Sequence, residues 1–586
     1  MRPRVFRHIS VCATLFRQVR TATRAAGAHG IMQGGMDKPT PEQRGETPAD
    51  ETSGRTRRVR RPNNLPHLRP ADHVIRIHRG RKFHLRRVLG IPGLYSVGYG
   101  DVGSSIFYAL GLVVVAAAGA TPIALAIAGL FFVFTALTYA EGASMFPEAG
   151  GSSTFARQGF NDLAAFIAGW SLMFGYIITI SISIYTVPHY LAYFWPVLGH
   201  ASSAVYFSLG ATAFLMAINV LGIRESSGMN FSLTVVVLII QALLIITGMV
   251  LFFEPGLLWG RMSTAWPSVS SLVFGVAIAT VAYTGIESVS QLAGEARDPQ
   301  RRVPKALIYM IFTVLIVFAG ISLTAFSVTT PADLANNWSE DAVAGVANGI
   351  YMQIDPQAFA NAHATDPTLN AVIYFFANIF RSIFRPAVAV MGAAILLIAA
   401  NAGLLGISRI TFSLAEHHSL PPALGRIHKR FKTPYIAILC FGLIAMVILL
   451  QGLFLTKIFE ILGGLYAFGS MVTFAIAHAS IIRLRVTSPN LRRPFKLKLN
   501  VRIKKSQIPI TAVIGLLSAV VVWVVVVIQQ PYSRYVGIAW MGIGLLVYFL
   551  YRRAKGMHML HHRAPPPPVE NKQQKLHDEN PRSTGR

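Results

Sequence analysis

The chain has 586 residues, of which 53% are hydrophobic and only 13% carry a charged side chain. That charged share is about half of what an ordinary soluble domain has, so the composition excludes a disordered protein and a typical soluble enzyme. The apolar residues gather in runs of about 20, the length that crosses a hydrocarbon core of roughly 30 Å as a helix. The sequence therefore predicts an all-α integral membrane protein.

Residues 1–89 are strongly basic, with 20 Lys and Arg against 6 Asp and Glu, and they account for +14 of the net charge of +28. Because cytoplasmic tails and loops of membrane proteins are rich in Lys and Arg, membrane topology explains this charge better than nucleic-acid binding does. We expect residues 1–89 to be a disordered cytoplasmic tail, whose basic end at 76–89 can bind anionic lipids.

The first 36 residues contain six Arg and no acidic residue, which loosely resembles a mitochondrial presequence. Disorder, or a translation start at Met32 or Met36, is the preferred interpretation. The two cysteines, Cys12 and Cys440, are poorly placed to pair, so we expect no disulfide and no zinc site.

Twelve apolar runs are predicted to span the membrane, and each is followed by a short polar connection or a longer loop. The expected spans are 90–118, 121–146, 163–195, 203–222, 230–253, 270–293, 305–329, 386–410, 434–454, 457–482, 508–529 and 533–552. We expect the stretch 369–385 to form an interfacial or re-entrant helix rather than a thirteenth span. Residues 90–552 would be the membrane domain, and 553–586 a disordered cytoplasmic tail.

The loops predict the orientation of these spans. Those after spans 6, 8 and 10 are basic, and the last of them has nine Lys and Arg between 483 and 505. Residues 330–368 contain five acidic residues and no Lys or Arg. Because basic loops stay in the cytoplasm, both termini should be cytoplasmic in a multi-pass protein of the plasma membrane.

Three acidic residues lie within predicted membrane spans or at the end of one. A charge at the bilayer centre costs something like 2.5–3.5 kcal/mol, so such residues usually have a function or a partner. Asp101 lies in span 1, Glu141 at the inner end of span 2, and Glu287 in span 6. For Glu141, nearer the interface, a structural or gating role is favoured over contact with a ligand. Asp101 and Glu287 can instead mark a transport pathway, although a buried acid bonded to neighbouring helices remains the alternative for Glu287.

Glycines surround two of these acids. Asp101 stands in GYGDVGSS, and Glu287 follows Tyr283, Thr284 and Gly285. Broken backbone inside a membrane is tolerated only where it is buried or lines a cavity, and paired interrupted helices indicate a transporter site. A close helix crossing built from small residues is the alternative explanation. The sequence has no ATP-binding loop, metalloprotease motif or nucleophile motif, so we expect neither enzyme activity nor a cofactor nor a bound metal.

Four stretches resemble the amino acid permeases of the amino acid–polyamine–organocation superfamily. They are GDVGSSIFYALG, TYAEGASMFPEAGGSSTFARQGF, VAYTGIESVSQLAGEARDPQRRVPKAL and NAGLLGISRITFSLAEHHSLPPALGRIHKRFKTP. The resemblance implies a LeuT-like fold, with an inverted repeat of five plus five helices and with helices 1 and 6 broken. It also implies secondary active transport of an amino acid or related amine by alternating access.

The resemblance assigns residues to substrate and ion. A substrate carboxylate would meet the helix 1 break at Gly103, Ser104 and Ser105, and the amine would lie near Ala282, Tyr283 and Thr284 of the helix 6 break. Gly100, Asp101 and Gly285 in the same two breaks are also expected to contact the substrate. A cation position between helices 1 and 8 would involve Val97, Gly98, Asn401 and Ser408. Coupling and gating would fall to Asp101, Glu287 and Glu141.

Two departures from the family pattern leave alternatives open. Some proton-coupled members carry a Lys in helix 5, but the matching position is about Val237 and this span has no Lys. Asp101 stands where many permeases have a neutral residue, so we expect it to be the protonatable group of a proton-coupled transporter. Because YGDVGSS is also similar to a stretch of KUP-type potassium transporters, potassium uptake is the first alternative. A non-transporting sensor or scaffold is the second.

Overall fold

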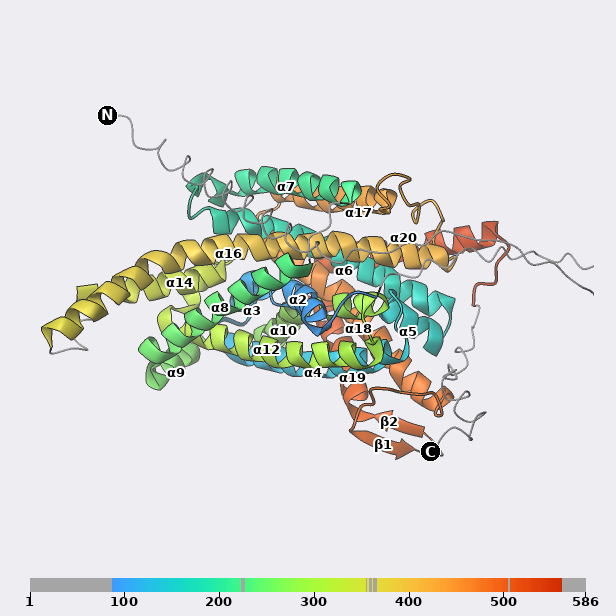
Figure 1. Cartoon of the computed structure of the whole chain (residues 1–586), viewed down its shortest axis with the longest axis horizontal. Coiled ribbons are helices and arrows are strands. Elements are labelled where there is room, and N and C mark those ends of the chain that lie inside the picture. The colour runs from blue at the N-terminus through green and yellow to red at the C-terminus, as the bar shows by residue number, and fades with distance from the viewer. Residues whose placement is uncertain are drawn as a thin grey trace, which may run out of the picture. The chain divides into compact units, whose positions relative to one another are not determined.

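The computed structural model describes residues 87–222, 227–354, 356–357, 361, 366–503 and 506–560. Of the tails predicted at 1–89 and 553–586, all but 87–89 and 553–560 lie outside these described residues. Within them the secondary structure is helical apart from one short hairpin (Figure 1).

The helices follow each other in a membrane domain that begins just after the basic segment. In chain order they are α2 (Ile91–Val102), α3 (Ile106–Ala117), α4 (Thr121–Met145), α5 (Ser152–Gly159), α6 (Asp162–Leu191), α7 (Ala201–Leu221), α8 (Ser227–Phe252), α9 (Pro255–Thr264), α10 (Val269–Ala279), α11 (Ile286–Gln291), α12 (Pro299–Val328), α13 (Pro331–Asn337), α14 (Ala342–Gln353), α16 (Pro367–Glu416), α17 (Tyr435–Leu450), α18 (Ile458–Thr487), α19 (Ile510–Gln529) and α20 (Pro531–Ala554). Short 3-10 helices are η1 (Ala118–Ala120), η2 (Pro196–Gly199), η3 (Thr280–Tyr283), η4 (Leu292–Glu295) and η5 (Gln451–Leu453). Between α18 and α19, the antiparallel strands β1 (Asn500–Ile503) and β2 (Ser506–Pro509) form a hairpin that the sequence analysis did not predict.

Eleven helical segments among the described residues are long and apolar enough to cross a membrane, where the sequence predicted twelve spans. The difference lies in Ile91–Met145, a segment of 55 residues that covers the spans expected at 90–118 and 121–146. At 1.5 Å per residue, a helical segment of that length is roughly 80 Å long, more than twice the thickness of the hydrocarbon core.

Helix α16 joins the stretch 369–385 to the span expected at 386–410. It is one continuous helix of 50 residues, so a re-entrant helix at 369–385 is wrong, while an interfacial position of this stretch stays a prediction. Asp366 caps its start by accepting hydrogen bonds from the amides of Thr368 and Leu369, at 2.7 and 3.3 Å. No Gly or Pro occurs between Pro367, the first residue of the helix, and Pro386, which lies inside the helix without ending it.

Helices α6 and α16 pack along each other (Figure 1), and glycines on α16 make the close approach possible. A Cβ on Gly406 would lie 2.6 Å from Cζ of Tyr176, and one on Gly392 would lie 2.6 Å from Cδ1 of Tyr190. The two tyrosine rings of α6 are therefore fixed by the α16 backbone.

The segment just before α2 forms hydrogen bonds with the segment just after η4. Leu89 forms a parallel bridge with Ala296, in which its amide donates to the carbonyl of Glu295 at 3.0 Å and the Arg297 amide donates to the Leu89 carbonyl at 2.9 Å. Helix α2 then runs against α11. Residues 88–89 thus belong to the folded domain rather than to the predicted tail.

Candidate functional site between the interrupted helices

The first interruption is a tight turn between α2 and α3. Gly103 keeps right-handed dihedral angles, and its amide donates to the Tyr99 carbonyl at 2.6 Å. A Cβ at this position would lie 2.5 Å from the Tyr99 ring, so close packing requires glycine here. The hydroxyl of Ser104 donates to the Asp101 carbonyl at 2.7 Å, and that of Ser105 lies 2.8 Å from the Tyr108 hydroxyl.

This turn already uses several of the amides to which the resemblance assigns a substrate carboxylate. The amides of Gly103, Ser105 and Phe107 all donate to carbonyls of the turn. The predicted carboxylate position at Gly103, Ser104 and Ser105 therefore has fewer amides to offer than a fully broken helix would have.

The second interruption is wider. Thr284 is extended with ψ 159°, and Gly285 has φ 107°, a conformation that only glycine adopts at little cost. The Gly285 amide donates to Oε2 of Glu287 at 3.0 Å, so this side chain fixes the backbone at the start of α11. A role of Glu287 in coupling or gating stays a prediction.

The two interruptions face each other at Asp101 and Gly285. A Cβ on Gly285 would lie 2.8 Å from Cγ of Asp101 and 3.1 Å from its backbone carbonyl carbon. Asp101 is 2% exposed, and among the described residues its Oδ2 atom has no hydrogen-bond partner, although the Ser288 side chain interacts with the same carboxyl group. A buried carboxyl oxygen without a donor is costly, so this atom is a candidate contact for a cation, an amine or a proton.

A small cavity lies beside Gly285, between α6, α11 and α18. It is lined by Leu172, Gly175, Tyr176, Thr179, Gly285, Glu287, Tyr466 and Ser470. The Tyr176 hydroxyl accepts a hydrogen bond from Nε2 of Gln291 at 2.8 Å, which fixes the ring in the cavity wall. None of these lining side chains is basic, and Glu287 is the charged side chain among them.

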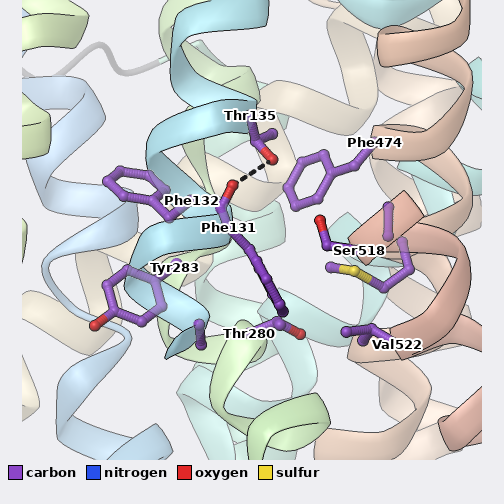
Figure 2. A pocket seen from close by; sticks show the side chains of 11 residues that line it. Phe131, Phe132, Thr135, Thr280, Tyr283, Phe474, Ser518 and Val522 are labelled. Atoms are coloured by element: carbon purple, nitrogen blue, oxygen red, sulfur yellow. Dashed lines mark hydrogen bonds between the residues drawn. The ribbon is translucent and has the colours of Figure 1, made fainter. Parts of the chain in front are cut away.

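Tyr283 does not point into this cavity. Its hydroxyl donates to the Leu125 carbonyl at 2.8 Å, and its ring packs against Phe132 and Phe318 with centroids 5.3 and 5.1 Å away. The side chain lines a second cavity between α4, η3, α18 and α19, shown in Figure 2. Of the residues at this break that are predicted to contact the substrate, Gly285 lines the first cavity. Ala282 and Thr284, close to Gly285 in the sequence, are buried.

Two residues of the predicted cation position contact other helices. A Cβ on Gly98 would meet Val289 of α11 and Met310 of α12. Asn401 accepts a hydrogen bond from Asn219 of α7 at 2.6 Å.

Ser408 and Val97 complete the predicted cation position. The Ser408 hydroxyl donates to the carbonyl of Leu405 in its own helix. Val97 is partly buried in α2. The cation position formed by Val97, Gly98, Asn401 and Ser408 stays a prediction.

Glu141 is a structural link between distant segments. It is fully buried and bonds the Arg485 guanidinium in a bidentate pair, at 2.7 and 2.6 Å. Its Oε2 also accepts from the Leu497 amide at 2.9 Å, and Arg493 lies 3.5 Å away. Glu141 thus joins the end of α4 to α18 and to the segment before β1, as expected for a structural or gating residue.

Several residues of this region were missed by the sequence analysis. Tyr176, Tyr466 and Ser470 line the cavity, and Gln241 of α8 accepts a hydrogen bond from the Tyr99 hydroxyl at 2.7 Å. A single Gln in an apolar run is a signal that could have pointed to Gln241. The tyrosines gave none, because aromatic residues within spans usually serve packing.

Comparison with known proteins identifies the family. A model described as "Amino acid permease" matches residues 89–550. The chain belongs to this permease family. It is therefore a multi-pass membrane transporter. No group of three or more His, Cys, Asp or Glu residues that could hold a metal occurs among the described residues.

Relatives of this permease carry different cargoes. The branched-chain amino acid permease BcaP from Bacillus subtilis is 28% identical over 80% of this chain and 94% of its own. The low-affinity putrescine importer PlaP from Escherichia coli is 23% identical over 68% of this chain and 81% of its own. A crystal structure of a manganese transporter from Eremococcus coleocola covers 79% of this chain and 93% of its own, at 13% identity and a TM-score of 0.47. A TM-score this low says nothing about the fold of this permease.

Proposed function

We propose that the chain is a secondary active transporter of amino acids or related amines in the plasma membrane, working by alternating access and driven by protons. The observation that carries the proposal is the juxtaposition of Asp101 and Gly285 beside the cavity between α6, α11 and α18. Intramembrane acids at interrupted helices are typical of substrate and coupling-ion sites.

The fold expected for this function has twelve crossings and an inverted repeat of five plus five helices. Helix 1 corresponds to α2 and α3, and helix 6 to α10 and α11. The 55 residues of Ile91–Met145 are long enough for two crossings, which supports an even number of spans with both termini in the cytoplasm. The basic collar at 76–89 would lie at the inner membrane surface, where anionic lipids attract it.

The amine is the substrate group that the cavity suits best. Branched-chain amino acids and putrescine, the cargoes named for the two relatives, share an amine, while only the amino acids have a carboxylate. Glu287 lines the cavity and Asp101 lies against Gly285, and both attract an ammonium group. A substrate carboxylate at the neighbouring turn would instead be repelled while Asp101 is ionised.

Protonation of Asp101 provides the coupling step. A proton on its unpartnered Oδ2 atom removes the negative charge next to Gly103, Ser104 and Ser105. The carboxylate of an amino acid can then approach the turn while its amine stays near Glu287. Release of the proton on the other side of the membrane restores the repulsion and favours release of the substrate.

Uptake by purified protein in liposomes tests the proposal. Pooled labelled amino acids, labelled putrescine and rubidium are offered with and without an inward pH gradient. We expect amino acid or amine uptake that depends on the gradient, and the dependence should be lost in Asp101→Asn but kept in Glu460→Gln, a partly exposed acid of α18. Rubidium uptake alone, or unchanged pH dependence in Asp101→Asn, would contradict the proposal.

A further inference from the structure

The hairpin of β1 and β2 is attached directly to a membrane span. Strand β2 ends at Pro509, and α19 begins at the next residue, Ile510. Helix α19 has 20 residues and is about 30 Å long, which matches the thickness of the hydrocarbon core. The hairpin therefore begins where the hydrocarbon ends, at the depth of the lipid headgroups. In Figure 1 its two strands lie at the edge of the helical domain.

Hydrogen bonds hold the hairpin at the surface of the domain. The Leu497 amide, three residues before β1, donates to the buried carboxylate of Glu141 at 2.9 Å. The Ile510 amide donates to the Leu499 carbonyl at 3.0 Å, which adds one pair to the ladder between the two strands. Strand β2 also packs against α18, and Pro509 is buried there. The two faces of the hairpin therefore have fixed directions relative to α19.

The exposed apolar side of α19 continues onto the hairpin. Exposed aliphatic residues recur every three or four positions along one side of this helix, at Ile510, Ile514, Leu517, Val521, Val524 and Ile528. Leu499, which is bonded to Ile510 at the start of this side, is 62% exposed. Val501 follows two residues later on the same face, is 48% exposed and pairs with Ile508. The lipid-facing surface of α19 thus extends past the end of the helix into the headgroup layer.

The charged side chains of the segment 483–509 are all basic. Lys496, Lys498 and Arg502 are exposed, and Arg502 pairs with Gln507 on the face of the hairpin opposite Val501. Basic side chains at a membrane surface attract anionic lipids, while apolar side chains beside them enter the boundary between headgroups and acyl chains. The hairpin carries both kinds of side chain at that depth.

We propose that the hairpin of β1 and β2 docks on the bilayer surface and binds anionic lipids there. Leu499 and Val501 contact the first carbons of the acyl chains, and Lys498 and Arg502 contact the headgroup phosphates. The contact requires a bilayer but no substrate, so it is independent of the proposed transport function.

Quenching of a fluorophore by brominated lipid tests the docking. With Cys12 and Cys440 replaced, Val501→Cys places the fluorophore bimane on the apolar face of β1, and Gln507→Cys places it on the opposite face of β2. The full chain is placed in nanodiscs whose phosphatidylcholine carries bromine near the top of the acyl chain. We expect strong quenching at position 501 and little at position 507. Equal quenching at the two positions would overturn the proposal, and so would a fluorophore at 501 that lipid does not quench, whether it is in water or covered by protein.

The preference for anionic lipid is tested with bromine on phosphatidylglycerol or on phosphatidylcholine at the same mole fraction. We expect more quenching at position 501 from the anionic lipid, and equal quenching by the two lipids would contradict the assignment. The excess should be lost when Lys498→Gln and Arg502→Gln are combined. It should be kept when Arg426→Gln and Lys429→Gln are combined, because these exposed residues lie in the loop between α16 and α17.

The two double variants remove the same charge from exposed positions, so both should fold. An excess that survives in both would show that the hairpin does not select the lipid. Because quenching requires no transport, a failure here is distinct from a failure of the proposed function.

Discussion

Gly285 and Asp101 touch where the two interrupted helices meet, with so little space between them that a Cβ on Gly285 would lie 2.8 Å from Cγ of Asp101. Glycine is needed at position 285 for two reasons: the close contact with Asp101 leaves no room for a Cβ, and its φ of 107° is strained for other residues. The backbone of one interruption therefore fixes the position of the acid in the other.

Gly285→Ala should remove transport and lower stability. An alanine at positive φ costs about 1–3 kcal/mol, and its methyl group would also displace Asp101. Uptake in liposomes and thermal unfolding check this expectation. Gly542→Ala on α20 is the control, because a Cβ there has open space and its φ is ordinary. Normal uptake by Gly285→Ala would show that the contact is dispensable.

Glu141→Gln should destabilise the domain by roughly 3–5 kcal/mol, because it leaves Arg485 buried without its carboxylate. The pair formed by the exposed Lys457 and Glu460 of α18, 3.7 Å apart, offers a control near the surface. Glu460→Gln should change stability by less than about 1 kcal/mol. Denaturation of both variants in the same detergent tests the difference, and equal effects would refute a buried structural link.

The sequence predicted the residues that stand out from their immediate neighbours, but it did not predict contacts between residues far apart in the chain. Asp101, Glu287 and Gly285 stood out because acids and glycines are unusual in apolar runs. In the structure Gly285 and Glu287 line one cavity, and Asp101 lies against Gly285. The partner of Glu141 could not be predicted, because Arg485 is one of many basic residues far along the chain.

Side-chain direction was also invisible in the sequence. Tyr283 belongs to the predicted helix 6 interruption, yet its ring turns toward Phe132 and away from the cavity beside Glu287. Tyr176 enters that cavity wall because Gly406 admits its ring against α16. Both outcomes depend on how distant helices pack, which a local pattern of residues does not contain.

The segment between α12 and α16 should give a pH-dependent stability through Asp341. This residue is partly exposed, but burial of its carboxyl raises its pKa to about 8, and the nearby Glu340 adds to the rise. Since the folded-state pKa lies above the ordinary value of about 3.9, the stabilising contribution is complete below that value and is lost as pH rises through about 8. The melting temperature should therefore fall between pH 6 and pH 9.

Asp341→Asn should remove most of that fall. Asp366→Asn serves as the control with the opposite sign, because the amides of Thr368 and Leu369 lower the pKa of the Asp366 carboxyl. The contribution of the ionised Asp366 carboxyl to stability is present above the ordinary pKa of an Asp and is lost only in acid. This contribution should therefore stay constant between pH 6 and pH 9. An unchanged pH dependence in Asp341→Asn would assign the effect to another group.

The central claim is that the cavity between α6, α11 and α18 holds the substrate, and substrate protection of a single cysteine tests it most directly. With Cys12 and Cys440 replaced, Ser470→Cys places a thiol in that cavity, and Ser518→Cys places one in the cavity of Figure 2. We predict that a transported amino acid or amine slows labelling by a thiol reagent at position 470 and leaves position 518 unchanged. Protection at 518 without protection at 470 would contradict the claim.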